Sequence, residues 1–192
     1  SEGICETVQY NIDNNSLGKV WNISAICSMI ESGSDPVQGL ANFVTYWQEK
    51  MGEPCTGSNY NDYIASLKDI RPYPANDNAA GRAWTYQTCV EFGYYQSAEG
   101  RNQPFSEKIT IEWFVKQCEQ IFGIKGMRPN IDFTNAYYGA RNLVATKELL
   151  PNGSIDPWHA LGITVKPKGS DLHTFFMQGT AHCADLYAPR PT

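Results

Sequence analysis

The first two-thirds of the chain carry apolar residues at the spacing of amphipathic helices. Apolar residues recur at i, i+3, i+4 and i+7, which places them on one face of a helix. Four groups follow this spacing: Ile23, Ile26, Cys27 and Ile30; Leu40, Phe43, Val44, Trp47 and Met51; Tyr60, Tyr63, Ile64 and Leu67; and Ile111, Phe114, Val115, Cys118 and Phe122. Each group predicts one helix with a single buried stripe.

Capping residues mark where several of these helices begin and end. Ser34-Asp35-Pro36 is a helix-start signal, because Asp accepts hydrogen bonds from free amides and Pro suits the first turn. Glycines at 33, 52 and 123 follow apolar stripes as stops. Thr134 is predicted to cap a further short helix that runs through Tyr138 and ends at Gly139. Residues 71–81 form a turn-rich break, and the aromatic segment 83–96 has no clear period.

The pattern changes after residue 139, where two short apolar segments predict strands. Lys147–Leu150 ends at a proline, and Leu172–Met177 is mostly apolar without strict alternation. The second segment is typical of a strand buried on both faces in a parallel sheet. Because two strands do not make a stable sheet alone, most of that sheet is expected from residues outside this sequence. Both ends of the chain therefore resemble cuts through a larger protein.

Composition and charge narrow the class of protein. Hydrophobic residues make up 42% and charged residues 18% of the 192 residues, which is typical of a globular chain. The formal net charge is −5 and there is no run of Lys and Arg, which argues against nucleic acid and anionic membranes as partners. No apolar run approaches the roughly 20 residues that span a bilayer. The opening Ser1-Glu2-Gly3 is no signal peptide.

Six dispersed cysteines and three sequons favour the secretory pathway. No pair has the CxxC spacing of metal sites, which argues against zinc. No metal site and no cofactor are predicted for this chain. An even number of dispersed cysteines fits disulfides in an oxidising compartment, although reduced, buried cysteines in a cytosolic protein are the alternative. Sequons for N-glycosylation begin at Asn14, Asn22 and Asn152.

The ends of the two predicted strands carry the candidate chemistry. Asp156 follows the first strand and His182 follows the second, 26 residues later. In open α/β sheets functional groups lie beyond the carboxyl ends of strands, and the α/β-hydrolase triad runs in the order Ser, Asp, His. Less suitable rivals are His159, His173, Asp171 and Asp185. Taken singly, Asp156 before Pro157 is also a common helix cap, and His182 an ordinary loop histidine.

The nucleophile of such a triad is missing from this chain. It should stand in a Gly-x-Ser-x-Gly elbow upstream of the Asp, and no serine here has glycine two residues away on both sides. Cys183 beside His182 is an alternative thiolate nucleophile, but a structural or incidental thiol is preferred because it has no separate basic partner. The isolated chain is therefore expected to be inactive.

Several motifs in order resemble the prolyl carboxypeptidase family of serine peptidases, which includes lysosomal Pro-X carboxypeptidase, dipeptidyl peptidase II and thymus-specific serine protease. Residues 152–162 (NGSIDPWHALG) resemble its Asp motif and residues 179–187 (GTAHCADLY) its His motif. Residues 84–96 (WTYQTCVEFGYYQ) are similar to a segment of its helical cap, and residues 134–139 (TNAYYG) also match. The similar segments run from about residue 8 to residue 187, which covers nearly the whole chain.

The resemblance implies the C-terminal part of an α/β hydrolase with an inserted, mostly helical cap. Residues 1–125 would be cap and 126–192 hydrolase core. It implies that Asp156 and His182 are the triad acid and base, and that Trp158 walls a pocket for proline. Weaker implications are that Glu91 and Tyr94 contact substrate; a disulfide between Cys89 and Cys118 is implied as well.

The implied function is that of a secreted or lysosomal serine peptidase, exopeptidase-like, which acts on Pro-containing peptides by a Ser-His-Asp acyl-enzyme mechanism. The implied partners are a peptide substrate and the N-terminal part of the same hydrolase domain, which would supply the Ser. The alternatives are a non-catalytic binding protein or inactive fragment of the same fold, and an ester hydrolase.

Overall fold

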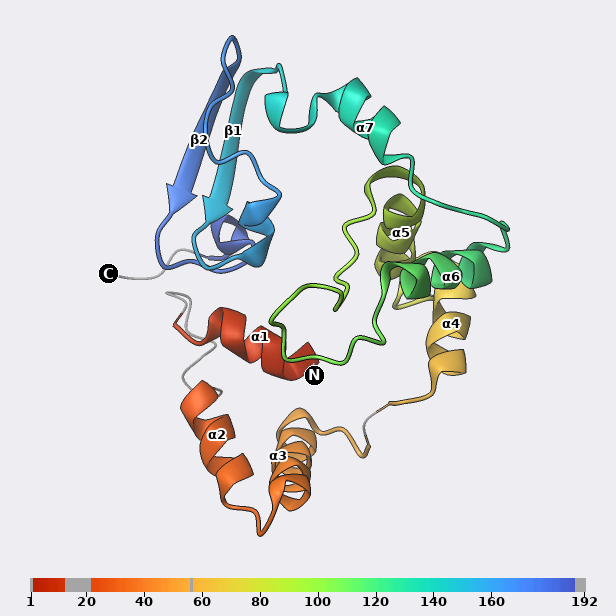
Figure 1. Cartoon of the computed structure of the whole chain (residues 1–192), viewed down its shortest axis with the longest axis vertical. Coiled ribbons are helices and arrows are strands. Elements are labelled where there is room, and N and C mark those ends of the chain that lie inside the picture. The colour runs from red at the N-terminus through yellow and green to blue at the C-terminus, as the bar shows by residue number, and fades with distance from the viewer. Residues whose placement is uncertain (1, 13–21, 56, 189–192) are drawn as a thin grey trace. The chain divides into compact units, whose positions relative to one another are not determined.

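The computed structural model describes residues 2–12, 22–55 and 57–188. The chain divides into two compact units, one made of residues 1–56 and 141–192 and the other of residues 57–140. Figure 1 shows the elements of both along the chain. Each unit is described by itself below.

The unit 57–140 is helical. Its elements are α4 (Tyr60–Lys68), α5 (Ala79–Gln87), the π-helical turn η2 (Thr88–Phe92), α6 (Ile111–Phe122) and α7 (Ile131–Tyr138). Helix α6 begins where the Thr110 side chain accepts a hydrogen bond from Trp113 N, and it ends at Gly123, whose φ is 71°. Its apolar stripe contributes Ile121 to a core with Ile64 and Leu67. The stripes of α4 and α6 were thus predicted only in part. Ile64, Leu67, Val115 and Cys118 are buried, but Tyr60, Tyr63 and Ile111 are exposed, and the buried Ile121 was not among the predicted residues.

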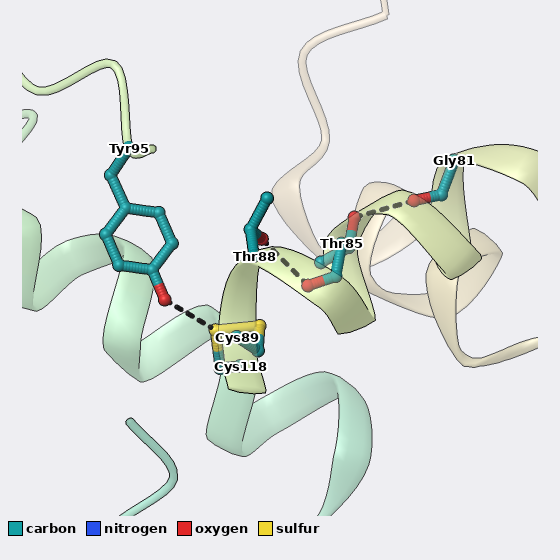
Figure 2. Close-up of a disulfide and its surroundings, with 6 residues drawn as sticks. All are labelled: Gly81, Thr85, Thr88, Cys89, Tyr95 and Cys118. Atoms are coloured by element: carbon teal, nitrogen blue, oxygen red, sulfur yellow. Dashed lines mark hydrogen bonds between the residues drawn. A yellow bond between two sulfur atoms is a disulfide. The ribbon is translucent and has the colours of Figure 1, made fainter. Parts of the chain in front are cut away.

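The aromatic segment 83–96 combines two kinds of helix, which explains its unclear period. Helix α5 runs directly into η2, where the chain adds a residue per turn. The hydroxyls of Thr85 and Thr88 donate to the carbonyls of Gly81 and Thr85, as Figure 2 shows. Bonds of this kind from a side chain back into the preceding turn often bend helices.

A disulfide between Cys89 in η2 and Cys118 in α6 confirms the predicted pair. Both cysteines are buried, at 0% and 1% exposure, and Met127 packs against them. The Tyr95 hydroxyl lies 3.4 Å from Cys118 Sγ, and its ring stacks on Phe114 with 5.1 Å between centroids. Burial raises the pKa of Tyr95 above its usual value. The disulfide therefore lies in a dry, aromatic part of this unit.

The predicted start of the last helix in this unit was wrong. Helix α7 begins at Ile131, three residues before Thr134, although it ends at Gly139 as expected. The Thr134 hydroxyl donates to the carbonyls of Asn130 and Glu91 instead of capping the helix. A hydroxyl inside a helix finds backbone oxygens as partners, so its type alone does not fix the helix start.

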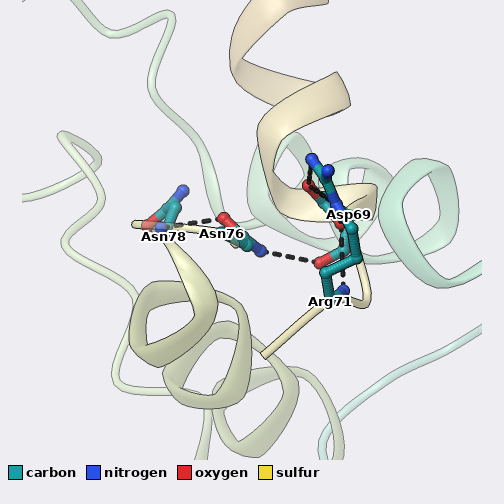
Figure 3. Close-up of polar contacts among 4 residues, drawn as sticks. All are labelled: Asp69, Arg71, Asn76 and Asn78. Atoms are coloured by element: carbon teal, nitrogen blue, oxygen red, sulfur yellow. Dashed lines mark hydrogen bonds and ion pairs between the residues drawn. The ribbon is translucent and has the colours of Figure 1, made fainter. Parts of the chain in front are cut away.

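Polar side chains hold the turn between α4 and α5, as Figure 3 shows. The Arg71 guanidinium pairs with the Asp69 carboxylate at 2.6 Å, and Arg71 N also donates to it. Asn76 Nδ2 donates to the Asp69 carbonyl, and Asn78 N donates to Asn76 Oδ1. The peptide bond between Tyr73 and Pro74 within this turn is cis. The hydrogen bonds from Arg71 lower the pKa of Asp69 to about 2.

This lowered pKa predicts a stability change in acid. Ionised Asp69 stabilises the fold above its ordinary pKa near 4, and that contribution is lost as pH falls through the folded value of about 2. We expect Asp69→Asn to lower the melting temperature at pH 6, by an amount that shrinks between pH 4 and pH 2. Thermal melts of both proteins across this range measure it, with Arg71→Gln as the variant that removes the partner. A difference that does not change with pH would contradict the prediction.

The unit made of residues 1–56 and 141–192 contains helices and a sheet. Its helices include α1 (Glu2–Tyr10), α2 (Ile23–Glu31) and α3 (Pro36–Met51). The Asp35 carboxylate accepts from Val37 N and Gln38 N at the start of α3, as its sequence predicts. Helices α2 and α3 cross closely at Gly39, because a Cβ there would lie 1.9 Å from the Ile30 carbonyl oxygen.

The sheet has two parallel strands, which confirms the predicted strands and their direction. Strand β1 (Thr146–Gly153) pairs with β2 (Asp171–Met177), and Asn152 lies opposite Phe176. Leu172 is buried, but Phe175 is 57% and Leu149 63% exposed. In the described chain β2 pairs with β1 alone, so these side chains are uncovered, and burial of β2 on both faces stays a prediction for a sheet completed by residues outside this sequence.

The expected domain boundary near residue 125 falls inside the unit 57–140. Met127 packs on the disulfide, and Asn130 N donates to the Val90 carbonyl at 2.9 Å. The division into an inserted cap and a hydrolase core stays a prediction. Within the described part of the chain, helices fall short of the length and apolar character that a membrane crossing needs.

Candidate active site

Asp156 and His182 meet beyond the carboxyl ends of β1 and β2. His182 Nδ1 lies 2.8 Å from Asp156 Oδ2. The Asp156 side chain is 12% exposed, whereas that of His182 is 47% exposed. A buried carboxylate thus holds an imidazole that other groups can still reach. The two residues that the sequence places at neighbouring strand ends are therefore brought into hydrogen-bond contact.

Asp156 caps a helical turn and pairs with His182 at the same time. The turn η4 (Pro157–Ala160) is a 3₁₀ helix, and Trp158 N donates to Asp156 Oδ1 at 2.9 Å. The second carboxylate oxygen, Oδ2, is thereby left for His182. The sequence offered a helix cap and a triad acid as alternatives, but a carboxylate has two oxygens and here each has its own partner.

The pairing fixes the protonation pattern of the imidazole. An ionised carboxylate only accepts hydrogen bonds, so in the neutral ring Nδ1 carries the hydrogen that Asp156 Oδ2 accepts. The lone pair of the neutral ring is then on Nε2. This is the tautomer in which a histidine can take a proton from a nucleophile. The Tyr187 hydroxyl donates to the His182 carbonyl and helps to hold the backbone.

Backbone contacts fasten the two strand-end loops together. Ser154 N donates to the Met177 carbonyl, and Ile155 N donates to the Thr180 carbonyl at 3.0 Å. Gly179 N donates to Ser154 Oγ. The approach is close at Gly153, where a Cβ would lie 2.5 Å from the Thr180 carbonyl oxygen. Only glycine fits there, so Gly153 lets the loop that carries Asp156 approach the loop that carries His182.

Gly153→Ala should therefore separate Asp156 from His182. Overpacking of this kind costs about 1–3 kcal/mol of folding free energy. The two nearest atoms are the carbonyl oxygens of Thr180 and Ala181, and backbone atoms do not move easily. Urea unfolding measures the loss. Gly100→Ala is the matched control, since a Cβ there meets nothing within 4 Å. Equal losses in the two variants would show that the close approach at Gly153 is unimportant.

The structure gives the rival residues other positions. His159 Nδ1 lies 2.6 Å from the Asp156 carbonyl oxygen, and its ring meets Phe176 edge to face. His173 and Asp171 belong to β2 itself, before its carboxyl end. Asp185 lies in the short 3₁₀ helix η5 (Ala184–Leu186). The pair that forms is the one that the triad order selects.

Cys183 has the properties of a neutral thiol. Burial, together with the negative charges of Asp185 and Asp156, raises the pKa of Cys183 above its ordinary value. A raised pKa keeps the thiol protonated at neutral pH, and the protonated form is a poor nucleophile. The residue has a left-handed backbone conformation with φ 56°, directly after His182.

The remaining predicted site residues are spread over both units. Trp158 is half-buried in η4, in the same unit as Asp156. Glu91 lies in η2, and the Tyr94 ring lies 4.8 Å from that of Phe92, both in the unit 57–140. Asn22 caps α2, Asn152 lies in β1, and Asn14 falls outside the described residues.

Sequence reasoning missed the residues that hold the loops in place. Gly153 was predicted only as part of the Asp motif, although it belongs to β1 and a glycine within a strand can mark a close backbone approach. Ser154 was noticed only as part of a sequon. Arg141 donates to the Ala160 carbonyl at the end of η4. Nothing in the sequence indicates that contact, because the two residues are 19 positions apart.

Among the described residues, no group of three or more His, Cys, Asp or Glu side chains is arranged to hold a metal ion.

Comparison with known proteins finds relatives that are named as peptidases. The profile of the family described as Serine carboxypeptidase S28 matches residues 2–192. A Caenorhabditis elegans protein named as a serine protease is 37% identical over 195 residues, covering 95% of this chain and 38% of its own length. Thymus-specific serine protease of Mus musculus is 31% identical over 194 residues, covering 97% of this chain and 37% of its own length.

Lysosomal Pro-X carboxypeptidase of Bos taurus is 29% identical over 132 residues, covering 67% of this chain and 26% of its own length. The chain thus spans less than two fifths of the length of these relatives. No solved structure matches the chain.

Proposed function

The chain belongs to the serine carboxypeptidase S28 family, and from this premise we propose that Asp156 and His182 are the acid and the base of a serine peptidase. The hydrogen bond of 2.8 Å between His182 Nδ1 and Asp156 Oδ2 carries the proposal. Members of the family are α/β hydrolases, in which such a pair lies at the carboxyl ends of neighbouring strands.

In the proposed reaction, His182 Nε2 takes the proton of a serine hydroxyl as the serine oxygen attacks a peptide carbonyl. Asp156 stabilises the imidazolium that forms and holds its orientation. The imidazolium then gives its proton to the leaving amine, and an acyl-enzyme remains. A water molecule, activated in the same way by Nε2, hydrolyses the acyl-enzyme and restores both groups.

We propose that the serine comes from a segment of the full-length protein outside these 192 residues. No Gly-x-Ser-x-Gly occurs in the sequence, and the relatives are more than twice as long as the part that matches. The exposed Leu149 and Phe175 on the two-stranded sheet are positions that further strands and helices of that segment would cover. The 192 residues alone would then bind no acyl group and hydrolyse nothing.

A preference for Pro-containing peptides is the finer part of the proposal. Trp158 follows Asp156 by two residues, and an indole face gives a proline ring an apolar surface. Glu91 and Tyr94 are proposed as further substrate contacts from the unit 57–140. Relatives include a lysosomal Pro-X carboxypeptidase, which supports both this substrate class and a lysosomal or secreted location.

The test is an assay of the full-length protein on Pro-containing peptides and on a short acyl ester. We expect peptide hydrolysis, its loss in His182→Ala, and its retention in Cys183→Ala, because a raised pKa favours the neutral form of the Cys183 thiol, which is a poor nucleophile. Faster ester than peptide hydrolysis would favour the ester hydrolase. Inactivity of a protein with an intact serine elbow would favour a binding protein of the same fold.

A further inference from the structure

Asn152, which the sequence marks as a glycan acceptor, is tied into the loop that carries Asp156. Its Nδ2 lies 3.3 Å from the Ile163 carbonyl oxygen and 3.4 Å from that of Leu150. Its Oδ1 lies 2.2 Å from the position that a Cβ on Gly162 would occupy. The carboxamide is therefore packed against the backbone on its oxygen side and bonded to carbonyls on its nitrogen side.

These contacts close the loop between residues 153 and 162 at its base. Asn152 is the last residue before Gly153, where the loop leaves β1, and one of its two partners, Ile163, is where the loop returns. At the return, Gly162 N donates to the carbonyls of Trp158 and His159. Asp156 lies in the middle of this loop, so the Asn152 carboxamide fastens both ends of the segment that presents the acid.

We infer that Asn152 is a positioning residue for Asp156 and that its sequon bears no glycan in the folded protein. The positioning role rests on the proposed function of Asp156, whereas the glycan statement rests on packing alone. A glycan would replace a hydrogen on Nδ2, the atom that faces two carbonyl oxygens. The sequon serine is also occupied, because Ser154 Oγ accepts from Gly179 N.

The sequon at Asn22 is the informative contrast. There the side-chain oxygen accepts from Ala25 N at 2.8 Å and caps α2. That oxygen keeps its acceptor capacity when a sugar is attached to the nitrogen, so a glycan at Asn22 is compatible with the cap. The two sequons differ in which atom of the carboxamide the fold uses.

The test is Asn152→Asp in the full-length protein. This change preserves the shape of the side chain but puts an acceptor against the two carbonyl oxygens. We expect kcat per active site to fall on the order of 10²-fold with KM unchanged, because a small misplacement of a catalytic group has effects of this size. The matched control is Asn61→Asp at an exposed position of helix α4, which should keep the wild-type kcat. If the Asn152→Asp variant has the wild-type kcat once its concentration of active sites has been determined by titration, the positioning role is overturned.

A second measurement separates this inference from the proposed function. In protein labelled with ¹⁵N-histidine, the far-downfield Nδ1 proton of His182 reports the bond to Asp156. Asn152→Asp should remove or shift this signal and Asn61→Asp should not, whether or not the protein hydrolyses peptides. An unchanged signal overturns the inference. So does a glycan found by mass spectrometry on Asn152 of folded protein from a eukaryotic secretory host.

Discussion

Asp156→Asn in the full-length protein is expected to lower kcat about 10⁴-fold, the size of effect measured for the same change in another serine peptidase triad. The asparagine oxygen can still accept from Trp158 N, so the cap of η4 is retained. The amide nitrogen then faces His182 Nδ1 as a donor. This forces the imidazole into the tautomer with its hydrogen on Nε2, where it cannot accept a proton from serine.

Steady-state kinetics on a Pro-containing peptide measure this loss, and circular dichroism checks that the variant is folded. The matched control is Asp185→Asn, which removes a rival carboxylate in η5 and should leave kcat near the wild-type value. An equal loss of kcat in the two variants would mean that the activity depends on the total negative charge near His182. In that case the hydrogen bond of Asp156 would not be the source of the activity.

The loss should lie in kcat and not in KM. The Asp156 side chain is 12% exposed and bonds to His182, so in the proposed mechanism it stabilises the charged imidazolium of the transition state and does not contact the substrate. Trp158→Ala is the contrasting change: if its indole forms the proline pocket, KM should rise for Pro-containing peptides. Together the two variants separate the chemistry from the binding.

The helices and strands were largely predictable because their signals are local. Asp35 followed by Pro36 starts α3 through two hydrogen bonds within three residues, and Gly123 ends α6 through its own φ. The contact between Asp156 and His182 was predictable for a related reason. Parallel strands place the residues that follow them at one edge, so chain order alone brings Asp156 and His182 together.

What was not predictable depends on contacts between distant segments. The Thr134 hydroxyl finds the Glu91 carbonyl, 43 residues away, and the type of the residue does not reveal this partner. Asn152 matches a sequon by three letters, but the use of its Nδ2 depends on where Ile163 returns. A sequence motif shows which residues are present. Whether such a residue can be modified or can react also depends on which of its atoms are hydrogen-bonded within the folded protein.

For the disulfide, the pairing was implied by the sequence, but its surroundings are known only from the structure. The pairing of Cys89 with Cys118 was implied by a resemblance, and the structure adds that a π-helical turn and a helix meet at these sulfurs. In the described chain, Cys5, Cys27, Cys55 and Cys183 are free thiols. The one cross-link of the described residues thus lies within the unit 57–140 and forms part of one of its two small core clusters.

Replacing both Cys89 and Cys118 by alanine should lower the free energy of unfolding of this unit by about 3–4 kcal/mol. The bond closes a loop with a sequence separation of 29, and restriction of the unfolded chain by a loop of that length gives a value of this size. The two alanines also remove sulfurs that contact Met127 and Tyr95, which adds to the loss.

Urea unfolding without reductant, followed by far-ultraviolet circular dichroism, measures the change. Cys27→Ala and Cys55→Ala are matched controls, because both thiols are free and exposed, and surface changes of this kind stay within about 0.5 kcal/mol. The wild-type protein should also resist dithiothreitol under native conditions, since its two sulfurs are shielded from solvent, and lose the bond in urea. A double variant that unfolds at the wild-type urea concentration would show that packing around η2 and α6 holds this unit without the cross-link.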